Sequence, residues 1–472
     1  MGYPRFLLAA PASGSGKTLI TCGILQAFCD RGLRTVSFKC GPDYIDPMFH
    51  SRVIGTKSRN LDTFFTDKGT TQYLLAKNAA GADISVIEGV MGYYDGLGGV
   101  STKASAYDLA KATETPVVLI VNCKGMSLSA AAMLKGYLEY RQDSRICGVI
   151  LNQMSEMLYP QIRRLIEEEL HIRCYGFVPV IKEWKLESRH LGLVLPGEVV
   201  DIQKHLQELA KLLEQTLDLD GLLELAGTAK ELSEDISTFP GDFELELYGE
   251  KTQLGQNIKQ APVVAVAKDE AFCFIYEDNL ELLQELGAKL EYFSPLHDEK
   301  LPEADGLLLY GGYPELYAQQ LSDNSSMRRS VKTALENGMP CMAECGGFMY
   351  LQQEMEDMNG AAHEMVGFIP ANAYRTGKLS RFGYITLQPQ EDQMLGMEIG
   401  EIRGHEFHYF DSTNCGTAFQ AKKPLRKRSW QCIWGTENCI AGFPHLYYYS
   451  NPRIAQRFLE KCAEYHQWKA GK

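Results

Sequence analysis

The sequence predicts an α/β protein with two domains, each built on a sheet that helices cover. Short apolar runs alternate with segments of helical length in the first half, which is typical of a parallel sheet. After a change of composition near residue 226, the same alternation begins again at Pro262. The length of 472 residues agrees with this, because domains commonly have roughly 100–200 residues.

Apolar runs in the first half predict buried strands of one parallel sheet, since parallel strands need long crossovers between them. Amphipathic segments such as Leu19–Arg31 and Ser129–Tyr140 supply helical crossovers. A helical stretch over Asp201–Leu225 closes this region, so we expect the first domain to span residues 1–225. The predicted strands are Arg5–Ala10, Arg34–Lys39, Ile84–Glu88, Pro116–Asn122, Ile146–Asn152 and Cys174–Val180.

Residues 226–259 differ in composition from both flanking regions, with several glycines and with seven acidic residues against three basic ones. This is typical of a linker or a surface connection. The second domain is therefore expected over residues 260–472. Its first strand is predicted from Pro262, and later runs such as Gly383–Gln388 predict strands without long helices between them. That pattern indicates an antiparallel or mixed extension of a second sheet.

Charge and cysteine content exclude several classes of protein. The 47 basic and 60 acidic residues give a net charge of −13, whereas a nucleic-acid coat or a binder of anionic membranes needs a cationic excess. The 13 cysteines stand singly, with no C-x-x-C pair, which favours reduced thiols over disulfides. Because the sequence has no signal-peptide layout and no window of ~18 apolar residues, we expect a cytoplasmic protein.

The first predicted strand ends in a glycine-rich loop, Ala10–Thr18, and a helix follows. Glycines let several backbone N–H groups point at one anion, and the helix N-terminus adds a favourable field for phosphate. The strict pattern G-x-x-x-x-G-K-[ST] has Pro11 at its first glycine, so the match is incomplete. We predict nucleotide binding, with Lys17 at the β- and γ-phosphates. The residues expected to contact ATP here are Ser13, Gly14, Ser15, Gly16, Lys17 and Thr18.

Four carboxylates follow the next predicted strands at the edge that carries this loop. They are Asp43 and Asp46 after one strand, and Glu88 and Asp95 after the next. In open α/β sheets, ligands bind outside the carboxyl ends of the strands. Mg²⁺ takes oxygen ligands, commonly one or two carboxylates completed by phosphates and waters. We therefore predict a Mg²⁺ site at Thr18, Asp46 and Glu88; the alternative for Asp43 and Asp95 is that they cap turns.

Two further side chains at this edge are candidates for contacts with ATP. Lys39 ends a predicted strand and is expected to steady a phosphoryl group during transfer, the alternative being a lysine that reaches solvent. Asn152 ends another predicted strand, where its amide offers a donor and an acceptor to the adenine edge.

The second half contains a cysteine in a setting that favours chemistry. Cys345 stands between a predicted strand and a predicted helix and is followed by Gly346 and Gly347. Such an elbow is expected to expose the thiol, to lower its pKa at a helix N-terminus and to offer N–H groups to an oxyanion. The Gly311-Gly312 turn is a further candidate source of N–H groups for the oxyanion. A cysteine nucleophile needs a base, for which His445 is the candidate.

The remaining cysteines and histidines have other interpretations. Cys341 lies inside the strand that leads to the elbow and is expected in the core, as a small apolar residue. His405 and His408 do not have the H-E-x-x-H spacing of a zinc helix. We expect their segment to be a strand that presents polar residues to a substrate or to the second active site.

Taken together, these motifs resemble the family of cobyrinic acid a,c-diamide synthases over nearly the whole chain. That family joins a dethiobiotin-synthetase-like ATP domain, a P-loop parallel sheet, to a class I type glutamine amidotransferase domain. The stretches that carry the resemblance are Ala10–Thr18, Lys39–Pro47, Glu88–Gly96, Gly311–Glu315, Glu344–Phe348 and Gly404–Tyr409.

The resemblance implies an ATP- and glutamine-dependent ligase of cobalamin biosynthesis. ATP would phosphorylate the a and c acetate carboxylates of cobyrinic acid, and ammonia from glutamine would displace phosphate. Cys345 would be the glutaminase nucleophile and His445 its base, with Gly312 and Gly346 forming the oxyanion hole. The phosphate loop and Glu88 would serve ATP·Mg²⁺. The residues implied for the corrinoid carboxylate and its metal are Asp43, Tyr44, Asp46 and Asp95.

The chain departs from the wider amidotransferase class at one position. The usual H-x-E motif places a glutamate two residues after the histidine, and here Tyr447 stands there. A dyad is therefore expected, and the group that orients His445 stays open.

Several alternatives stay open at this stage. The same chemistry could act on hydrogenobyrinic acid or nickel sirohydrochlorin. An ATP switch without enzymatic activity, carrying an inactive glutaminase-like domain, and a CTP-synthase-like amidation of a nucleotide are less favoured. The expected partners are ATP, L-glutamine and a tetrapyrrole carboxylate, and a homodimer is an open possibility.

Overall fold

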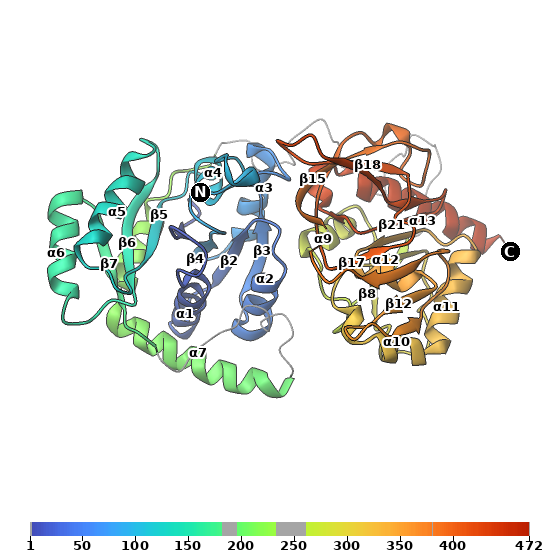
Figure 1. Ribbon diagram of the computed structural model, residues 1–472, viewed down its shortest axis with the longest axis horizontal. Helices are drawn as coiled ribbons and strands as arrows, with labels where there is room; N and C mark the ends of the chain where they lie inside the picture. The colour runs from blue at the N-terminus through green and yellow to red at the C-terminus, as the bar shows by residue number, and fades with distance from the viewer. Residues whose placement is uncertain (1, 182–195, 233–260, 380, 472) are drawn as a thin grey trace. The chain divides into compact units, whose positions relative to one another are not determined.

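A computed structural model describes residues 2–181, 196–232, 261–379 and 381–471 of the chain (Figure 1). The chain divides into two compact units, Met1–Pro240 and Gly241–Lys472, which are treated separately below. Most of the predicted connection over residues 226–259 lies outside the described residues. In the described part, no helix is long and apolar enough to cross a membrane.

In the described part of the first unit, seven parallel strands form one sheet, ordered β3-β2-β4-β1-β5-β6-β7. Each predicted strand is present, so the predicted parallel sheet is confirmed. The strands are β1 Arg5–Ala9, β2 Thr35–Cys40, β3 Lys57–Leu61, β4 Ile84–Glu88, β5 Val117–Asn122, β6 Ile146–Asn152 and β7 Arg173–Val178.

The strand β3 is missing from the sequence-based prediction. Its residues, KSRNL, are mostly polar and lack the apolar run by which the other strands are recognised. As an edge strand that pairs with β2 alone, β3 can carry such residues without burying them on both faces.

Helices flank the sheet of the first unit, and α7 packs against α1 (Figure 1). Apolar residues of β1, α1, α7 and α8 form a shared core, including Leu8, Ile24, Leu213 and Leu222. The helices are α1 Lys17–Asp30, α2 Ile45–Phe49, α3 Lys68–Ala79, α4 Ala106–Ala112, α5 Leu128–Glu139, α6 Tyr159–Leu170, α7 Pro196–Thr216 and α8 Leu219–Gly227, with a π-helical turn η1 His50–Ile54 and a 3₁₀ turn η2 Leu97–Gly99.

The helical stretch predicted over Asp201–Leu225 is two helices rather than one. The helix α7 ends before Leu217, which bridges to Gly176 within β7. Asp218 then begins α8, because its side chain accepts a hydrogen bond from the Gly221 N–H. Local capping thus ends a run that periodicity alone would continue.

In the second unit, residues 261–379 and 381–471 contain a six-stranded sheet ordered β20-β21-β11-β10-β8-β9, parallel except for β20. The predicted strand from Pro262 is β8. The strands of this sheet are β8 Val263–Ala267, β9 Lys289–Phe293, β10 Gly306–Leu309, β11 Cys341–Glu344, β20 Trp434–Gly435 and β21 Cys439–Gly442.

Two smaller sheets extend the second unit, ordered β13-β12-β14-β17 and β19-β18-β15-β16-β22. The second of them is antiparallel, as the sequence predicts for the region after Gly347. Their strands are β12 Glu354–Glu356, β13 Ala362–Glu364, β14 Asn372–Arg375, β15 Arg381–Pro389, β16 Ile402–His408, β17 Phe410–Ser412, β18 Phe419–Lys422, β19 Ser429–Cys432 and β22 His445–Leu446.

Helices complete the second unit, and every cysteine of the chain lies within the described residues as a free thiol, as predicted. Cys341 is fully buried on β11, which confirms its predicted place in the core. The helices of this unit are α9 Glu277–Glu285, α10 Ala318–Asp323, α11 Ser325–Glu336, α12 Gly346–Leu351 and α13 Arg453–Ala470, with 3₁₀ turns η4 Pro314–Leu316, η5 Met397–Ile399 and η6 Tyr448–Ser450.

Candidate active sites at a phosphate loop and a cysteine elbow

The glycine-rich loop lies where the sequence predicts it, between β1 and α1. Gly14 and Gly16 have φ values of 76° and 92°, in the left-handed region that favours glycine. A Cβ atom on Gly16 would lie 2.3 Å from the Asn152 Nδ2 atom, so a side chain there would displace Asn152. The loop therefore depends on glycine at this position for both conformation and space.

Lys17 and Thr18 are held by specific contacts at the start of α1. The Lys17 ammonium donates to the Met91 carbonyl oxygen at 2.6 Å and to the Ala12 carbonyl oxygen at 3.3 Å. Burial lowers the pKa of Lys17 to about 8, and the nearby Lys39 charge acts in the same direction. The Thr18 hydroxyl donates to Glu88 Oε1 at 2.7 Å. The two residues thus bring a cation and a hydroxyl to the end of β4.

Lys39, Asp46 and Glu88 form a buried charge cluster at the same edge. The Lys39 ammonium contacts Asp46 Oδ2 and lies 2.9 Å from Glu88 Oε1. Burial alone would lower the pKa of Lys39, but the two carboxylates outweigh it and raise that pKa above its usual range. Burial raises the pKa of Glu88 to about 7, with Lys39 opposing the shift. Lys39 is 4% exposed, so the alternative in which it reaches solvent is wrong.

His50 belongs to this cluster and is missed by the sequence reasoning. Its Nε2 atom lies 3.6 Å from Glu88 Oε2, and its Nδ1 atom lies 3.2 Å from the Ser37 hydroxyl. Burial lowers the pKa of His50 to about 4, so the ring is neutral at physiological pH. The available signal was its spacing, since His50 follows Asp46 by four residues, which is one helical turn.

The residues predicted to hold Mg²⁺ are brought together, and their chemistry fits that ion. Asp46 and Glu88 share the Lys39 ammonium, and Thr18 donates to Glu88. Among the described residues, no group of three or more His, Cys, Asp or Glu side chains could hold a metal. Mg²⁺ does not need one, because phosphate oxygens and waters commonly complete a shell begun by one or two carboxylates.

Asp43, Tyr44 and Asp95 also lie at this edge, and the two aspartates make contacts with backbone N–H groups of turns. Asp43 Oδ1 accepts from the Ile45 N–H at 2.8 Å, and burial raises the pKa of Asp43 to about 6. Asp95 Oδ2 accepts from the Gly92 N–H at 3.2 Å. Both aspartates therefore cap turns, which is the alternative interpretation. Tyr44, the residue after Asp43, is buried.

Asn152 and the loop serines are also placed by the structure. The Asn152 Nδ2 atom donates to the Ser15 carbonyl oxygen at 2.8 Å, and its Oδ1 atom accepts from the Gln153 N–H. These contacts hold the phosphate loop, and the predicted contact of Asn152 with adenine stays a prediction. The Ser15 hydroxyl donates to the Ala12 carbonyl oxygen, whereas Ser13 is exposed at the loop surface.

In the second unit, Cys345 forms the predicted strand-to-helix elbow between β11 and α12. Its φ of 46° with ψ of −100° is rare for a residue with a side chain and stores strain at this point. Two details of the prediction are wrong, because Cys345 is buried rather than exposed and its pKa is raised rather than lowered. Burial is the main cause, and the Glu315 carboxylate adds to it. The six-residue α12 does not outweigh these effects.

His445 on β22 reaches Cys345 across a glycine. A Cβ atom on Gly311 would lie 2.6 Å from His445 Cε1 and 3.4 Å from Cys345 Cβ. The cysteine and the histidine therefore converge over Gly311, from segments 100 residues apart in the chain. Glycine is required at residue 311 because any side chain there would enter the space between them.

Two histidines of β16 act on His445, His405 through a ring contact and His408 through its charge. The His405 ring stacks on the His445 ring with a centroid distance of 4.9 Å and an interplanar angle of 20°. Burial lowers the pKa of His445 to about 3, and His408 acts in the same direction. His445 is therefore neutral near pH 7 and able to accept a proton. The prediction that the segment of His405 and His408 is a strand facing the second site is confirmed.

The predicted oxyanion donors also lie together. The Gly346 N–H faces the Cys345 sulfur. A Cβ atom on Gly346 would lie 3.3 Å from the Gly312 nitrogen, so the two backbone segments are in contact. Two neighbouring amides already have acceptors in the protein. The Gly347 N–H donates to the Tyr310 carbonyl oxygen, and the Cys345 N–H donates to the Gly442 carbonyl oxygen.

Comparison with known families agrees with both sites. The model of the CobQ/CobB/MinD/ParA nucleotide binding domain matches residues 6–194. The model of the CobB/CobQ-like glutamine amidotransferase domain matches residues 263–452. Together with the fold, these matches define a glutamine amidotransferase joined to a P-loop nucleotide-binding domain.

Curated relatives are similar over nearly the full length. Cobyrinate a,c-diamide synthase of Caldanaerobacter subterraneus is 39% identical over 465 residues, covering 98% of both chains. The enzyme of that name from Listeria innocua is 40% identical, covering 96% of this chain and 98% of the relative. The chain therefore belongs to the cobyrinate a,c-diamide synthase family, and it is an amide-forming ligase that uses glutamine. This excludes the alternative of an ATP switch without enzymatic activity.

Replacing Gly311 with alanine tests the convergence of Cys345 and His445. We expect Gly311→Ala to lower glutamine hydrolysis by about 10²-fold, because small displacements of catalytic groups have effects of this size. The measurement is glutamate release with and without ammonia as an alternative nitrogen donor. Gly136→Ala is the control, since a Cβ atom there would meet open space on α5. Unchanged glutamate release by Gly311→Ala would contradict the assigned geometry.

The raised pKa of Cys345 gives a prediction about thiol reactivity. Burial raises the pKa of Glu315 to about 7, so this carboxyl is charged at about pH 8.5 and mostly neutral at about pH 6. Removing its charge stabilises the thiolate, so Glu315→Gln should speed iodoacetamide labelling of Cys345 about threefold at the higher pH. At the lower pH the variant and the parent should react alike. Peptide mass spectrometry resolves Cys345 from the other cysteines, with Glu291→Gln on exposed β9 as control.

Proposed function

We propose that this chain converts the a and c acetate carboxylates of cobyrinic acid to amides, with ATP as the activator and glutamine as the nitrogen donor. The observation that carries this proposal is the presence of two separate, complete sets of groups on one chain. The first unit has Lys17, Thr18 and Glu88 at a phosphate loop, and the second has Cys345 and His445 over a glycine. Relatives with the same two halves are named for this reaction.

In the first unit, a carboxylate oxygen of the substrate would attack the γ-phosphorus of ATP. This forms an acyl phosphate and releases ADP, after which ammonia attacks the acyl carbon and inorganic phosphate leaves. Lys17 and Lys39 would stabilise negative charge on the transferred group. Mg²⁺, when bound by Thr18, Asp46 and Glu88 together with the phosphates, would neutralise part of the nucleotide charge.

In the second unit, the sulfur of Cys345 would attack the side-chain amide carbon of glutamine while His445 accepts the thiol proton. The N–H groups of Gly312 and Gly346 would bind the oxyanion that forms. His445 then gives the proton to the leaving ammonia, and water hydrolyses the thioester to glutamate. Because the thiol is protonated and the imidazole is neutral in the free enzyme, this proton transfer would accompany the attack.

Asp43, Tyr44 and Asp95 are proposed to contact the tetrapyrrole, since they lie at the phosphate-loop edge beside the charge cluster. The same groups would serve hydrogenobyrinic acid or nickel sirohydrochlorin. These two substrates are the competing outcomes of the assay that follows.

Mass spectrometry of the product tests the reaction and the substrate. With ATP, Mg²⁺ and glutamine, cobyrinic acid should lose about one dalton twice, once for each conversion of a carboxyl group to an amide. Conversion of a rival tetrapyrrole alone would assign that substrate instead, and no mass change with any of them would overturn the proposal. Cys345→Ala should lower glutamine-dependent amidation by about 10³-fold or more and leave ammonia-dependent amidation intact.

Oxygen isotope transfer tests the acyl phosphate. If both oxygens of the a and c carboxylates are ¹⁸O, one labelled oxygen should appear in inorganic phosphate for each amide formed, because phosphate leaves with the oxygen that attacked ATP. The isotope shift of the phosphate resonance in ³¹P NMR gives the measurement. Phosphate without label, in a reaction that still forms amide, would exclude the intermediate. A reaction in labelled water with unlabelled substrate is the control.

A further inference from the structure

The histidine base of the glutaminase site has no glutamate two residues after it, and the structure shows what that position does instead. The Tyr447 hydroxyl donates to Asp278 Oδ2 at 2.9 Å. Asp278 lies on α9, and both residues are buried. Residue 447 thus ties the end of β22 to α9, and its hydroxyl is directed to Asp278.

Glu344 supplies a carboxyl group beside the Nδ1 atom of His445. It is the residue directly before Cys345, and on β11 it is in register with Gly442 of β21. Its Oε2 atom lies 3.7 Å from the Nδ1 atom of His445. The exposed fractions are 4% for Glu344 and 2% for His445, so the contact is shielded from water. Contacts of this length in ligand-free enzymes commonly shorten when substrate binds.

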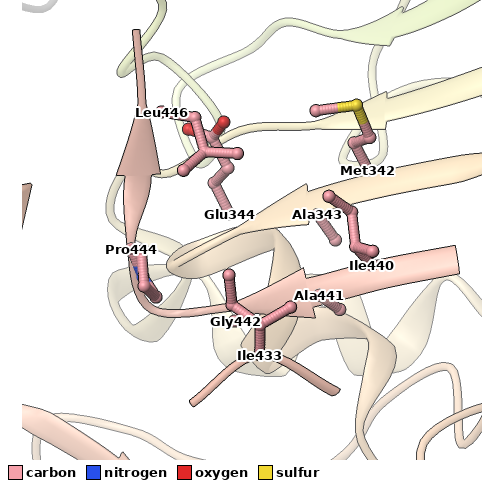
Figure 2. Close-up of a pocket in the computed structure, with 9 residues that line it drawn as sticks. All are labelled: Met342, Ala343, Glu344, Ile433, Ile440, Ala441, Gly442, Pro444 and Leu446. Atoms are coloured by element: carbon pink, nitrogen blue, oxygen red, sulfur yellow. The ribbon is translucent and has the colours of Figure 1, made fainter. Parts of the chain in front are cut away.

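The pocket beside Glu344 is lined mainly by apolar side chains, which makes the position of its carboxyl group informative. Figure 2 shows Glu344 in a pocket whose lining includes Met342, Ile433 and Leu446, with its carboxyl group beside Leu446 on the strand of His445. A buried carboxyl group that is weakly hydrogen-bonded costs free energy, and neither oxygen of Glu344 makes a hydrogen bond of standard geometry among the described residues. His445 is the ring that it reaches, since Nδ1 faces Glu344 and Nε2 lies on the opposite side of the imidazole.

We propose that Glu344 is the positioning residue of the glutaminase site: its carboxyl oxygen accepts a hydrogen bond from the Nδ1–H of His445, so that the lone pair on Nε2 takes the proton of the Cys345 thiol. This rests on the proposed function of Cys345 and His445. An imidazole that carries its proton on Nδ1 has its lone pair on Nε2, which is the form that acts as a base. The proton then moves from sulfur to Nε2 and later to ammonia, while the Nδ1 proton stays in place.

Burial raises the pKa of Glu344 well above its usual range, and the Leu446 amide acts in the opposite direction. A neutral carboxyl group still has a carbonyl oxygen that accepts a hydrogen bond, so the proposed role does not require a charge. Other groups also face this pair. His405 stacks on the His445 ring, His408 acts on it electrostatically, and the hydroxyls of Tyr310 and Tyr448 lie near Glu344.

Two substitutions of Glu344 distinguish a role in positioning His445 from a role in packing alone. Glu344→Met keeps the length of the side chain and removes the acceptor, whereas Glu344→Gln keeps an acceptor oxygen. We expect the methionine variant to lose about 10²-fold in kcat for glutamine hydrolysis, with KM for glutamine nearly unchanged. The glutamine variant should stay within about tenfold of the parent. Ammonia-dependent amidation should be the same in all three. Tyr447→Phe is the matched control and should keep the parent's pH profile of glutamine hydrolysis.

The tautomer of His445 gives a second measurement that needs no Glu344 variant. In ¹⁵N-histidine NMR of the full chain, the resonance lost in His445→Asn should show the proton on Nδ1. A proton on Nε2 would overturn the proposal. So would a methionine variant with activity near that of the parent, or equal losses in the methionine and glutamine variants. A parent protein that hydrolyses no glutamine would contradict the proposed function instead, whereas the tautomer would still test the contact.

Discussion

Parallel strands bring their carboxyl ends to one edge of a sheet, and both proposed reactions depend on this constraint. In the first unit, β2, β4 and β1 are neighbours, so Thr18, Lys39 and Glu88 meet although the chain separates them widely. In the second unit, β10, β11 and β21 are neighbours, and the segments that follow them bring together Gly311, Cys345 and His445. The side chains at these strand ends are thus placed by the backbone pairing rather than by local sequence.

Burial then determines the charge state of the groups that the sheets bring together. At the phosphate-loop edge, Lys39 lies between Asp46 and Glu88, so the cost of burying the ammonium is offset by two carboxyl groups. At the elbow, the charged groups that act on the Cys345 thiol are the carboxyl groups of Glu315, Glu344 and Glu406. There the thiol of Cys345 keeps its proton and His445 stays neutral, because charging either of them alone in an apolar site is unfavourable. The first site thus holds charged groups that compensate one another, whereas the second holds an uncharged thiol and an uncharged imidazole.

The sequence was sufficient for the parts of the fold and sites that follow from local pattern. Apolar runs located the buried strands, and glycines beside Lys17 and Cys345 located the loop and the elbow. The polar edge strand β3 was missed because its residues give no apolar signal. The raised pKa of Cys345 was also missed, since burial of the elbow depends on how the second unit packs. His50 was missed because its contact with Glu88 joins two separate segments.

The contact between Glu344 and His445 shows why motif spacing can fail where geometry holds. A glutamate two residues after the histidine and a glutamate one residue before the cysteine are far apart along the chain. On the sheet they come close, because β11 pairs with β21, and β22 follows β21 after a short turn. The tautomer of the histidine base is set by the acceptor at Nδ1, and any strand that brings an acceptor there has the same effect. With that acceptor on β11, residue 447 is released to bind Asp278 and to fix β22 against α9.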